Sequence, residues 1–459
     1  MKPTSALCCL AFLLALPLAG EATARGRDGA PEAGVLEAGV LEAGVREGAG
    51  LDALGQSFDC PALRKLVAQA LLANKDLQLA VARLDAAKAQ QKAARAPLLP
   101  SFSLSANASR VNALTSTTGS LLVNDYAQAA LSYEPDIFGA IRKAGRAAGA
   151  RTASSAYQVK AVQLAVATQA MQYYVIVAAY DAQLAALKDQ FGNIQRLQAI
   201  VDHRAAENEV SAVEIGLVQQ QWASIQAEIS AVQSARQGEV AALAVLVGED
   251  AARFNLPFDP DALRGINGRR IALEQPFELI DQRPDLLAAQ QDLAAAKLNV
   301  AAVNAGQLPR LRLTPSGILG LASNPISVFA SFGALLSANL FEGGAITARK
   351  QEAQALARQA LLAYDKQRLV AGQEVVSSLA AVKSAQERET YWTSALLALE
   401  KGTRAAQSAY LDGDYPFNLV IDSRRNESAG QLARIGATRD RWLAQISTIR
   451  ALGGGAQWQ

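Results

Sequence analysis

Few side chains in this sequence have the types and spacing that catalysis or metal binding requires. The 459 residues contain one histidine, His203, and three cysteines, which excludes a multi-histidine metal site. Gly343 and Gly344 are not followed by the Lys-Ser/Thr pair with which a phosphate-binding loop holds its ligand. Most carboxylates occur at the spacings of solvated helix surfaces. We therefore expect no enzyme activity, no cofactor and no metal.

One charged pair differs from these solvated carboxylates. Asp422 and Arg425 are three residues apart, which places both on one face of a helix. Tyr410 precedes them across a glycine-containing turn, and Asn418 lies one helical turn before Asp422. On the residues alone, the favoured interpretation is an ordinary exposed pair that contributes less than about 1 kcal/mol. A larger role would require symmetry to bring several copies together.

The elements that carry these residues occur twice in the chain. Ala73–Ser105 aligns with Gln282–Thr314 at one constant offset, and Asn208–Gly248 aligns with Gly413–Gly453 at nearly the same offset. A repeat of about 200 residues indicates two copies of one structural plan. Each copy is predicted to contain a helix, a strand pair, a long helix, a tip and a returning helix. The predicted boundaries are 57–270 for the first repeat (strand pair 101–135, helical hairpin 140–247), 271–453 for the second (strand pair 309–340, helical hairpin 344–452), and 454–459 for a C-terminal tail.

The N-terminal residues predict export from the cytoplasm. Lys2, an apolar run and the tripeptide Ala22-Thr23-Ala24 are typical of a signal peptide, here 1–24. Residues 25–56 repeat the sequence EAGVL and are expected to form a low-complexity leader. Two of the cysteines lie in the signal, so Cys60 would have no intrachain partner and is expected to be buried as a small apolar residue. The net charge of +2 gives no indication of nucleic-acid binding.

Four segments alternate polar and apolar side chains, which is the pattern of strands with two different faces. They begin near Ser101, Tyr126, Arg310 and Val328. Segments of about ten residues can cross a bilayer as tilted strands. Four strands cannot close a barrel, and open edges are not viable in lipid, so three chains would have to contribute twelve strands. The side chains predicted to face lipid are Phe102, Leu104, Leu131, Leu313 and Phe332.

The predicted helices are too long for a single compact core. Residues 140–203 contain no proline and would span on the order of 90 Å as a helix. Apolar residues within this stretch follow the 3-4 spacing of a coiled coil. They include Val177, Leu184, Leu187, Ile194 and Val201. We therefore expect coiled-coil hairpins that form a tube, with tips near Asn208 and Gly413.

This order of elements resembles the TolC-like outer-membrane factor (outer membrane efflux protein) family, and within it the NodT-type branch paired with resistance-nodulation-division (RND) efflux pumps. Arg283-Pro284-Asp285-Leu286, followed by an alanine-rich helix and Leu308-Pro309, is similar to the mid-chain signature of that branch. Tyr133–Gly139 and Leu340–Gly344 resemble its strand-to-helix exits, and Tyr410–Gly413 with Val420–Arg425 resembles its second tip. Together these motifs extend over nearly all of the chain after Cys60.

The resemblance implies a mixed α and β fold. A homotrimer would form an all-antiparallel 12-stranded transmembrane β-barrel, four strands per chain, continuous with a 12-helix periplasmic α-barrel. Such a protein lies in the cell outer membrane, extends into the periplasm and serves as the passive exit channel of a tripartite RND-type system for drugs or toxic compounds. The implied partners are a periplasmic adaptor (membrane fusion) protein, an inner-membrane RND pump and outer-membrane lipid.

The resemblance also implies roles for individual residues. A gate at the periplasmic end would consist of Asp422, Arg425, Tyr410 and Asn418. Asn418 stands where the branch often has a bulky apolar residue, which would make a less dewetting constriction. The adaptor-docking tips would be formed by Asn208, Glu209, Ser211, Gly413 and Asp414.

Two alternatives stay open on the sequence. The outer-membrane duct of a type I protein secretion system would share the whole architecture. A periplasmic coiled-coil scaffold without a pore would share the helices, but it would have no need of the alternating strands.

Overall fold

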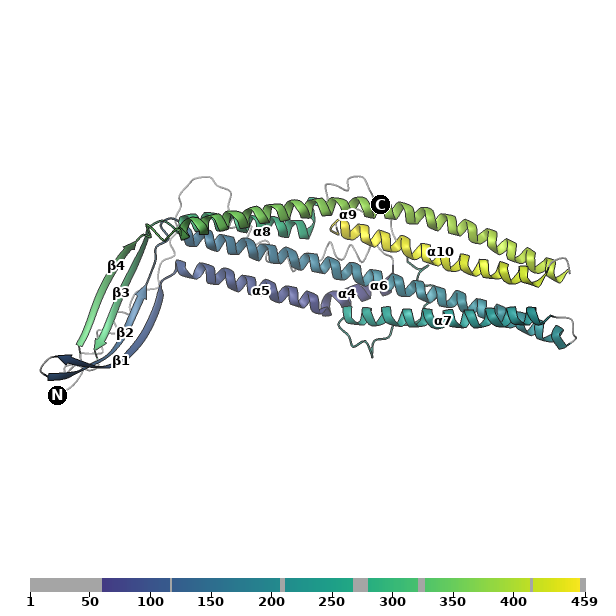
Figure 1. Ribbon diagram of the computed structural model, residues 1–459, viewed down its shortest axis with the longest axis horizontal. Coiled ribbons are helices and arrows are strands. Elements are labelled where there is room, and N and C mark those ends of the chain that lie inside the picture. The colour runs from purple at the N-terminus through teal and green to yellow at the C-terminus, as the bar shows by residue number, and fades with distance from the viewer. Residues whose placement is uncertain are drawn as a thin grey trace. The chain divides into compact units, whose positions relative to one another are not determined.

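The computed structural model describes residues 60–115, 118–206, 211–266, 280–320, 327–412 and 416–454. The predicted signal peptide and leader lie outside these residues. The first half contains α4 (Pro61–Ala73), α5 (Lys75–Arg95), η1 (Ala96–Leu98), β1 (Ser101–Thr115), β2 (Thr118–Ser132), α6 (Ala140–Ala206) and α7 (Ala212–Leu246). The second half contains η2 (Ile280–Gln282), α8 (Pro284–Ala305), β3 (Arg310–Gly320), β4 (Ser327–Ser337), α9 (Ala345–Leu411) and α10 (Phe417–Ala451) (Figure 1).

The duplication predicted from the sequence is visible in the lengths of the helices. The long helices α6 and α9 each contain 67 residues, and the returning helices α7 and α10 each contain 35. A helix of 67 residues extends about 100 Å. The strands lie at one end of these long helices, and the first turns of α7 and α10 lie at the other (Figure 1).

The four strands form one antiparallel sheet in the order β1-β2-β3-β4. The β1–β2 pairing runs from Ser101↔Ser132 to Thr115↔Thr118, and the β3–β4 pairing runs from Arg310↔Ser337 to Gly320↔Ser327. The β2–β3 pairing is shorter and joins Tyr126–Ala130 to Ser316–Gly320. Strands β1 and β4 are therefore the two edges of the described sheet.

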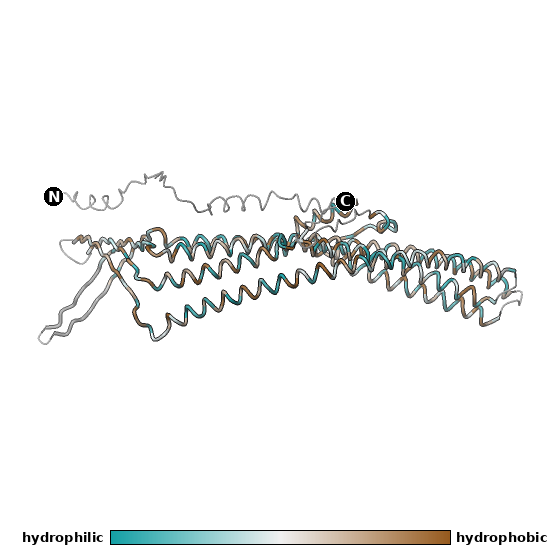
Figure 2. The backbone as a smooth tube through the Cα atoms, turned by 90° about the horizontal axis from the view of Figure 1, so that it is seen from above, coloured by the Kyte–Doolittle hydropathy of each residue, from teal (hydrophilic) through white to brown (hydrophobic). Residues whose placement is uncertain are grey.

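Helix α6 is the centre of the helical part and contacts α4, α5, α7, α8 and α10. The long helix α9 packs along α8 and α10. Among the described helices, α6 alone contains an 18-residue window apolar enough to cross a membrane, and 56% of that window is buried. Neighbouring helices therefore cover much of the apolar surface of this part of α6. Hydrophilic and hydrophobic positions alternate along the long helices (Figure 2), as expected for helices that pack on some faces only.

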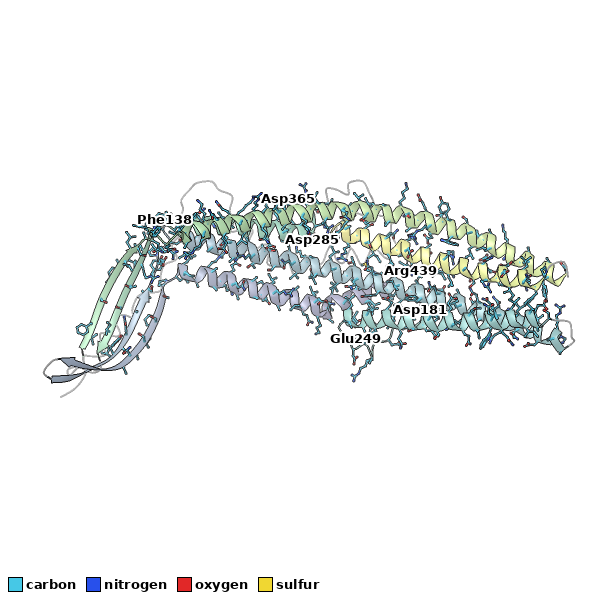
Figure 3. All side chains as sticks on the ribbon, in the orientation of Figure 1. Phe138, Asp181, Glu249, Asp285, Asp365 and Arg439 are labelled. Carbon is cyan, nitrogen blue, oxygen red and sulfur yellow. The ribbon has the colours of Figure 1, made fainter. Side chains whose placement is uncertain are left out.

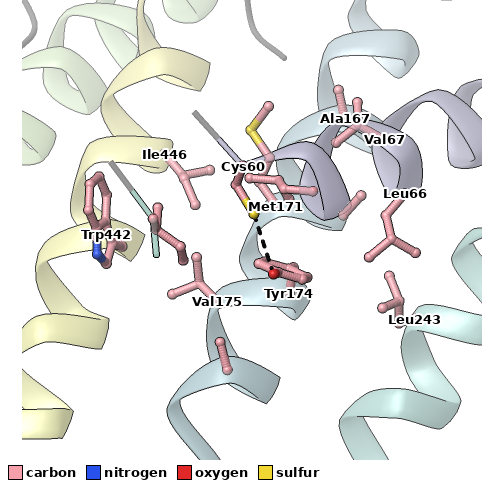
Figure 4. Close-up of a cluster of buried hydrophobic side chains, with 14 of the residues drawn as sticks. Cys60, Leu66, Val67, Ala167, Met171, Tyr174, Val175, Leu243, Trp442 and Ile446 are labelled. Carbon is pink, nitrogen blue, oxygen red and sulfur yellow. Dashed lines mark hydrogen bonds between the residues drawn. The ribbon is translucent and has the colours of Figure 1, made fainter. Parts of the chain in front are cut away.

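The largest core cluster lies where α4, α6, α7 and α10 meet. Cys60 is buried in this cluster, as the sequence predicted, and its Sγ lies 3.4 Å from the hydroxyl of Tyr174 on α6 (Figure 4). Burial and the contact with Cys60 raise the pKa of the Tyr174 phenol. The thiol therefore contributes to packing at the point where the described chain begins.

Each returning helix ends in the same way in the two halves. Gly248 and Gly453 follow α7 and α10 with φ of 74° and 70°, the left-handed conformation that terminates a helix. A side chain at Gly248 would lie 2.6 Å from the carbonyl oxygen of Ala73, and one at Gly453 would lie 3.1 Å from Cα of Arg283. Glycine is therefore required by both conformation and space.

A side chain that precedes an earlier helix of the same repeat, α5 in the first and α8 in the second, contacts each of these ends. Asn74 Nδ2 donates to the carbonyl oxygen of Leu246 at 2.9 Å, and Arg283 Nη1 donates to that of Ala451 at 2.9 Å. Asn74 and Arg283 occupy corresponding positions in the two repeats, and both are buried. Each repeat thus has a tether, a side-chain hydrogen bond to the last turn of its returning helix, formed by the Asn74 amide in the first repeat and by the Arg283 guanidinium in the second.

Candidate functional site

The gate residues predicted from the sequence lie near the tips of the helical hairpins. Asn418, Asp422 and Arg425 follow one another at four- and three-residue spacing along α10, so they share one helical face, and all three are exposed. Arg425 Nη1 lies 3.8 Å from Asp422 Oδ1, with side chains 49% and 61% exposed. Within one chain this is a weak, solvated pair.

Arg425 also contacts the other hairpin. Its Nε donates to Oε1 of Gln221 on α7 at 3.4 Å, and Gln221 is buried. The guanidinium therefore lies between an exposed carboxylate on its own helix and a buried amide on the first hairpin. A movement of α10 away from α7 would break the second contact.

Tyr410, assigned to the gate together with Asp422 and Arg425, bonds to neither of them among the described contacts. Its hydroxyl accepts a 2.6 Å hydrogen bond from Nη1 of Arg204 on α6, whose guanidinium lies 5.7 Å from the centre of the tyrosine ring. The ring of Tyr410 also packs against Phe417, with centroids 5.3 Å apart. Arg204 lies in the last turn of α6 and Tyr410 in the last turn of α9, so this bond joins the ends of the two long helices.

Sequence reasoning missed Arg204, because the pairing depends on two helices that are about 200 residues apart in the chain. Its position in the last turn of α6 was the available signal, since basic residues often occupy that turn to interact with the helix dipole.

A small apolar cluster lies beneath the gate residues and joins the two hairpins. Its buried members come from α6, α7 and α10, and they are Ile194, Val201, Val218, Ile225, Phe417 and Ile421. Phe417 is 2% exposed, so it cannot serve as an apolar plug in place of Asn418. Leu419, by contrast, is partly exposed on α10.

Of the predicted docking residues, the structure describes only Ser211. Asn208, Glu209, Gly413 and Asp414 lie outside the described residues. Ser211 caps α7: its Oγ accepts from the amide of Glu214 at 3.3 Å, and the Glu214 carboxylate accepts from the amide of Ser211 at 3.0 Å. This reciprocal capping box defines where the descending helix starts.

The sheet register places all five predicted lipid-facing side chains on one face. Phe102 pairs with Leu131. Leu313 lies opposite Tyr133, two residues after Leu131 and so on the same face, and Phe332 pairs with Pro315, two residues after Leu313. Phe102, Leu104 and Phe332 are 70%, 75% and 71% exposed. The opposite face carries polar side chains, among them Ser101, Ser103, Ser316, Ser331 and Arg312.

The signature around Arg283 forms a network at the start of α8. The guanidinium donates to Asp285 at 2.8 and 3.1 Å and to Glu374 on α9 at 2.7 Å, in addition to the Ala451 carbonyl on α10. Gln367 on α9 donates to Asp285 at 2.9 Å. Figure 3 shows Asp285 in this region between α9 and α10. Arg283 thereby connects three helices.

The direction of the pKa shift of Asp285 shows that its hydrogen bonds and ion pair outweigh the effect of burial. Burial opposes ionisation, but the hydrogen bonds and charge of Arg283, with further bonds from Gln367 and the Leu286 amide, hold the pKa of Asp285 below its usual value. Asp136, at the exit from β2, behaves similarly: bonds from Arg142 and the Ile141 amide outweigh burial and lower its pKa. Both carboxylates are therefore ionised network members at neutral pH.

Comparison with known proteins agrees with this geometry over most of the chain. The profile of the outer membrane efflux protein family matches residues 66–249 and 276–454, once for each structural repeat. The chain belongs to the outer membrane efflux protein family. It is thus an outer-membrane efflux channel of the RND-pump type that extends into the periplasm, and not an enzyme.

Similar sequences come from outer-membrane proteins of Pseudomonas. The chain is 28% identical to outer membrane protein OprJ of P. aeruginosa, over 99% of this chain and 96% of OprJ. It is also 28% identical to the toluene efflux pump outer membrane protein TtgC of P. putida, over 87% of this chain and 84% of TtgC.

Solved structures share the fold. The crystal structure of CusC matches with a TM-score of 0.80 at 21% identity, over 87% of this chain and 94% of that one. A membrane protein from P. aeruginosa matches with a TM-score of 0.81 at 26% identity, over the same shares. The long helices and four antiparallel strands expected from the sequence are therefore confirmed as a TolC-like fold.

Proposed function

We propose that this channel is a homotrimer whose twelve strands close a barrel in the outer membrane and whose long helices form a tube in the periplasm. The observation that carries the proposal is the single sheet with an exposed apolar face and two unpaired edges, β1 and β4, among the described strands. Unpaired backbone groups are not tolerated in lipid, and pairing β4 of one chain with β1 of the next would satisfy them. The apolar face, including Leu131 and Leu313, then meets lipid, and the polar face lines the pore.

We infer that the gate lies at the helical tips. Threefold symmetry would bring three copies of the face formed by Asn418, Asp422 and Arg425 close to the axis. The contacts that hold this face are modest: Arg425 to Gln221, and Tyr410 to Arg204. Each is a hydrogen bond to a charged group, so each stabilises the closed arrangement by about 1.5–3 kcal/mol at most. A gate built from such contacts can be opened by a partner that binds the tips.

The channel itself is proposed to be passive, with a periplasmic adaptor at the tips and an inner-membrane RND pump supplying the energy. The tip residues Asn208, Glu209, Ser211, Gly413 and Asp414 are the proposed adaptor contacts. The name of one relative, the toluene efflux pump outer membrane protein TtgC, indicates small organic molecules as the cargo class. This name favours small molecules over the proteins of a type I secretion system as the cargo.

The test combines oligomeric state with conductance. Native mass spectrometry in detergent should give a trimer, and a stable monomer would overturn the barrel. In a planar bilayer, Asp422→Ala with Arg425→Ala should raise the single-channel conductance, and Asn418→Leu should lower it by adding an apolar ring.

A matched control is available in the segment after α7. Asp250 and Arg253 are also three residues apart, with Arg253 Nε 3.9 Å from Asp250 Oδ2, and both are exposed. Their double alanine variant should leave the conductance unchanged. If the wild type and the Asp422/Arg425 double variant have equal conductance, Asp422 and Arg425 are an ordinary surface pair and not a gate.

A further inference from the structure

A cluster of arginines lies where the sheet gives way to the long helices. Arg310 and Arg312 begin β3, and Arg349 lies in the first turns of α9. Together with Glu134 and Glu342 they line a cavity of about 440 Å³ that also includes Ser337 and Asn339. In this lining the arginines outnumber the carboxylates by one.

The two carboxylates are shared among the three cations. Glu134 lies 4.0 Å from Nε of Arg310 and 3.6 Å from Nη2 of Arg312, and Glu342 lies 3.3 Å from Nη1 of Arg349. The arginine side chains are 58%, 58% and 66% exposed. Each guanidinium carries five N–H donors, so these contacts leave donors that face solvent.

The sheet register shows on which face of the sheet the arginines of this cavity lie. Arg310 and Arg312 alternate with Leu311 and Leu313, so their side chains project from the face opposite to the apolar one. Ser316 and Ser331, whose hydroxyls lie 2.8 Å apart, are on the same polar face. In the proposed trimer this face lines the pore, so the arginines would face the transported solute.

We propose that Arg310, Arg312 and Arg349 form an anion-binding collar at the barrel end of the pore, which attracts carboxylate, phosphate or sulfonate groups of solutes in transit. This inference rests on the proposed pore. Arginine forks match planar and tetrahedral oxyanions, and threefold repetition in one lumen would concentrate the positive charge. At the far end Asp422 is paired with Arg425, so the excess of arginine belongs to the collar.

The test is block of the ion current by inorganic tripolyphosphate added to the barrel side of a planar bilayer. Wild type should be blocked reversibly. Arg312→Gln with Arg349→Gln should raise the half-blocking concentration about tenfold or more, since each arginine removed takes away charge-assisted hydrogen bonds. Glu134→Gln should lower it, because it releases two arginines from their shared carboxylate. Arg253→Gln, an exposed arginine in the segment after α7, should have no effect.

The outcomes separate the collar from the pore. A wild-type channel that conducts but shows no block, or whose block is unchanged in the Arg312/Arg349 variant, overturns the collar and leaves the pore intact. Absence of any conductance overturns both. Arg349→Gln alone provides a second variant outside the sheet, and it should also weaken the block if the collar exists.

Discussion

Replacing Arg283 tests whether the network at the start of α8 stabilises the second hairpin. The side chain is 7% exposed and donates to Asp285, Glu374 and the Ala451 carbonyl, so Arg283→Ala removes contacts from three helices at once. Breaking a buried ion pair by removing one partner costs about 3–5 kcal/mol. Glu374 is half-exposed and regains water, and Asp285 keeps its bond from Gln367. We therefore expect a loss near the lower end, about 3 kcal/mol.

The assay is guanidinium unfolding of the detergent-solubilised protein, followed by far-ultraviolet circular dichroism of the helices. Arg283→Ala should lower the unfolding midpoint clearly, and Arg283→Lys should lie between it and the wild type, because an ammonium cannot form the fork to Asp285. Arg253→Ala, which removes an exposed pair, should leave the midpoint unchanged. A midpoint for Arg283→Ala equal to that of Arg253→Ala would refute the reasoning, since burial and multiple bonding would then carry no energetic weight.

Two further predictions concern the gate residues and the apolar face of the sheet. Tyr410→Phe keeps the ring contact with Phe417 but loses the bond from Arg204, so it should raise single-channel conductance, and combining it with Arg204→Gln should add less than the sum of the two single changes. Phe102→Arg and Leu313→Arg should each destabilise the protein in the membrane by a few kcal/mol if their sites lie near the bilayer midplane, whereas Ser103→Arg on the opposite face should assemble normally. Heat-modifiable gel migration measures this assembly, and normal assembly of both apolar-face variants would contradict the assignment.

The features that sequence reasoning predicted well are those with a period. The alternation of polar and apolar side chains predicted the strands and the shared face of Phe102, Leu131 and Phe332. Because side chains alternate between the two faces of a strand, their face is determined once the strand is assigned. The 3-4 spacing predicted buried seam residues such as Leu187, which is fully buried. The internal repeat predicted that α6 and α9 would be equivalent, and both contain 67 residues.

The contacts that sequence reasoning missed are specific pairs between distant segments. Tyr410 was assigned to the charged pair near it in sequence, but its hydroxyl bonds to Arg204 on the other hairpin. Phe417, next to Asn418 in the sequence, is buried between the hairpins. Neither contact could be predicted, because the pattern specifies which face of a helix is apolar, and not which neighbouring helix covers it.

The two forms of the tether predict that acid will loosen one hairpin before the other. Asn74 holds the end of α7 with a neutral amide, whereas Arg283 holds the end of α10 within a network that includes the Asp285 carboxylate. The pKa of Asp285 is lowered on folding, so its contribution to stability is present at pH values above its unfolded value near 3.8 and is lost as the pH falls through the lower folded value.

The amide of Asn74 does not titrate in this range, so only the hairpin that carries Asp422 and Arg425 should respond to acid through its tether. Hydrogen exchange followed from about pH 5 to about pH 2, and corrected for the intrinsic rate, should show protection lost at the end of α10 while the end of α7 stays protected. In Asp285→Asn the network is already weakened, so the two ends should differ at every pH and the difference should no longer grow with acid. If the wild-type ends lose protection together, the tethers do not control the stability of their hairpins separately.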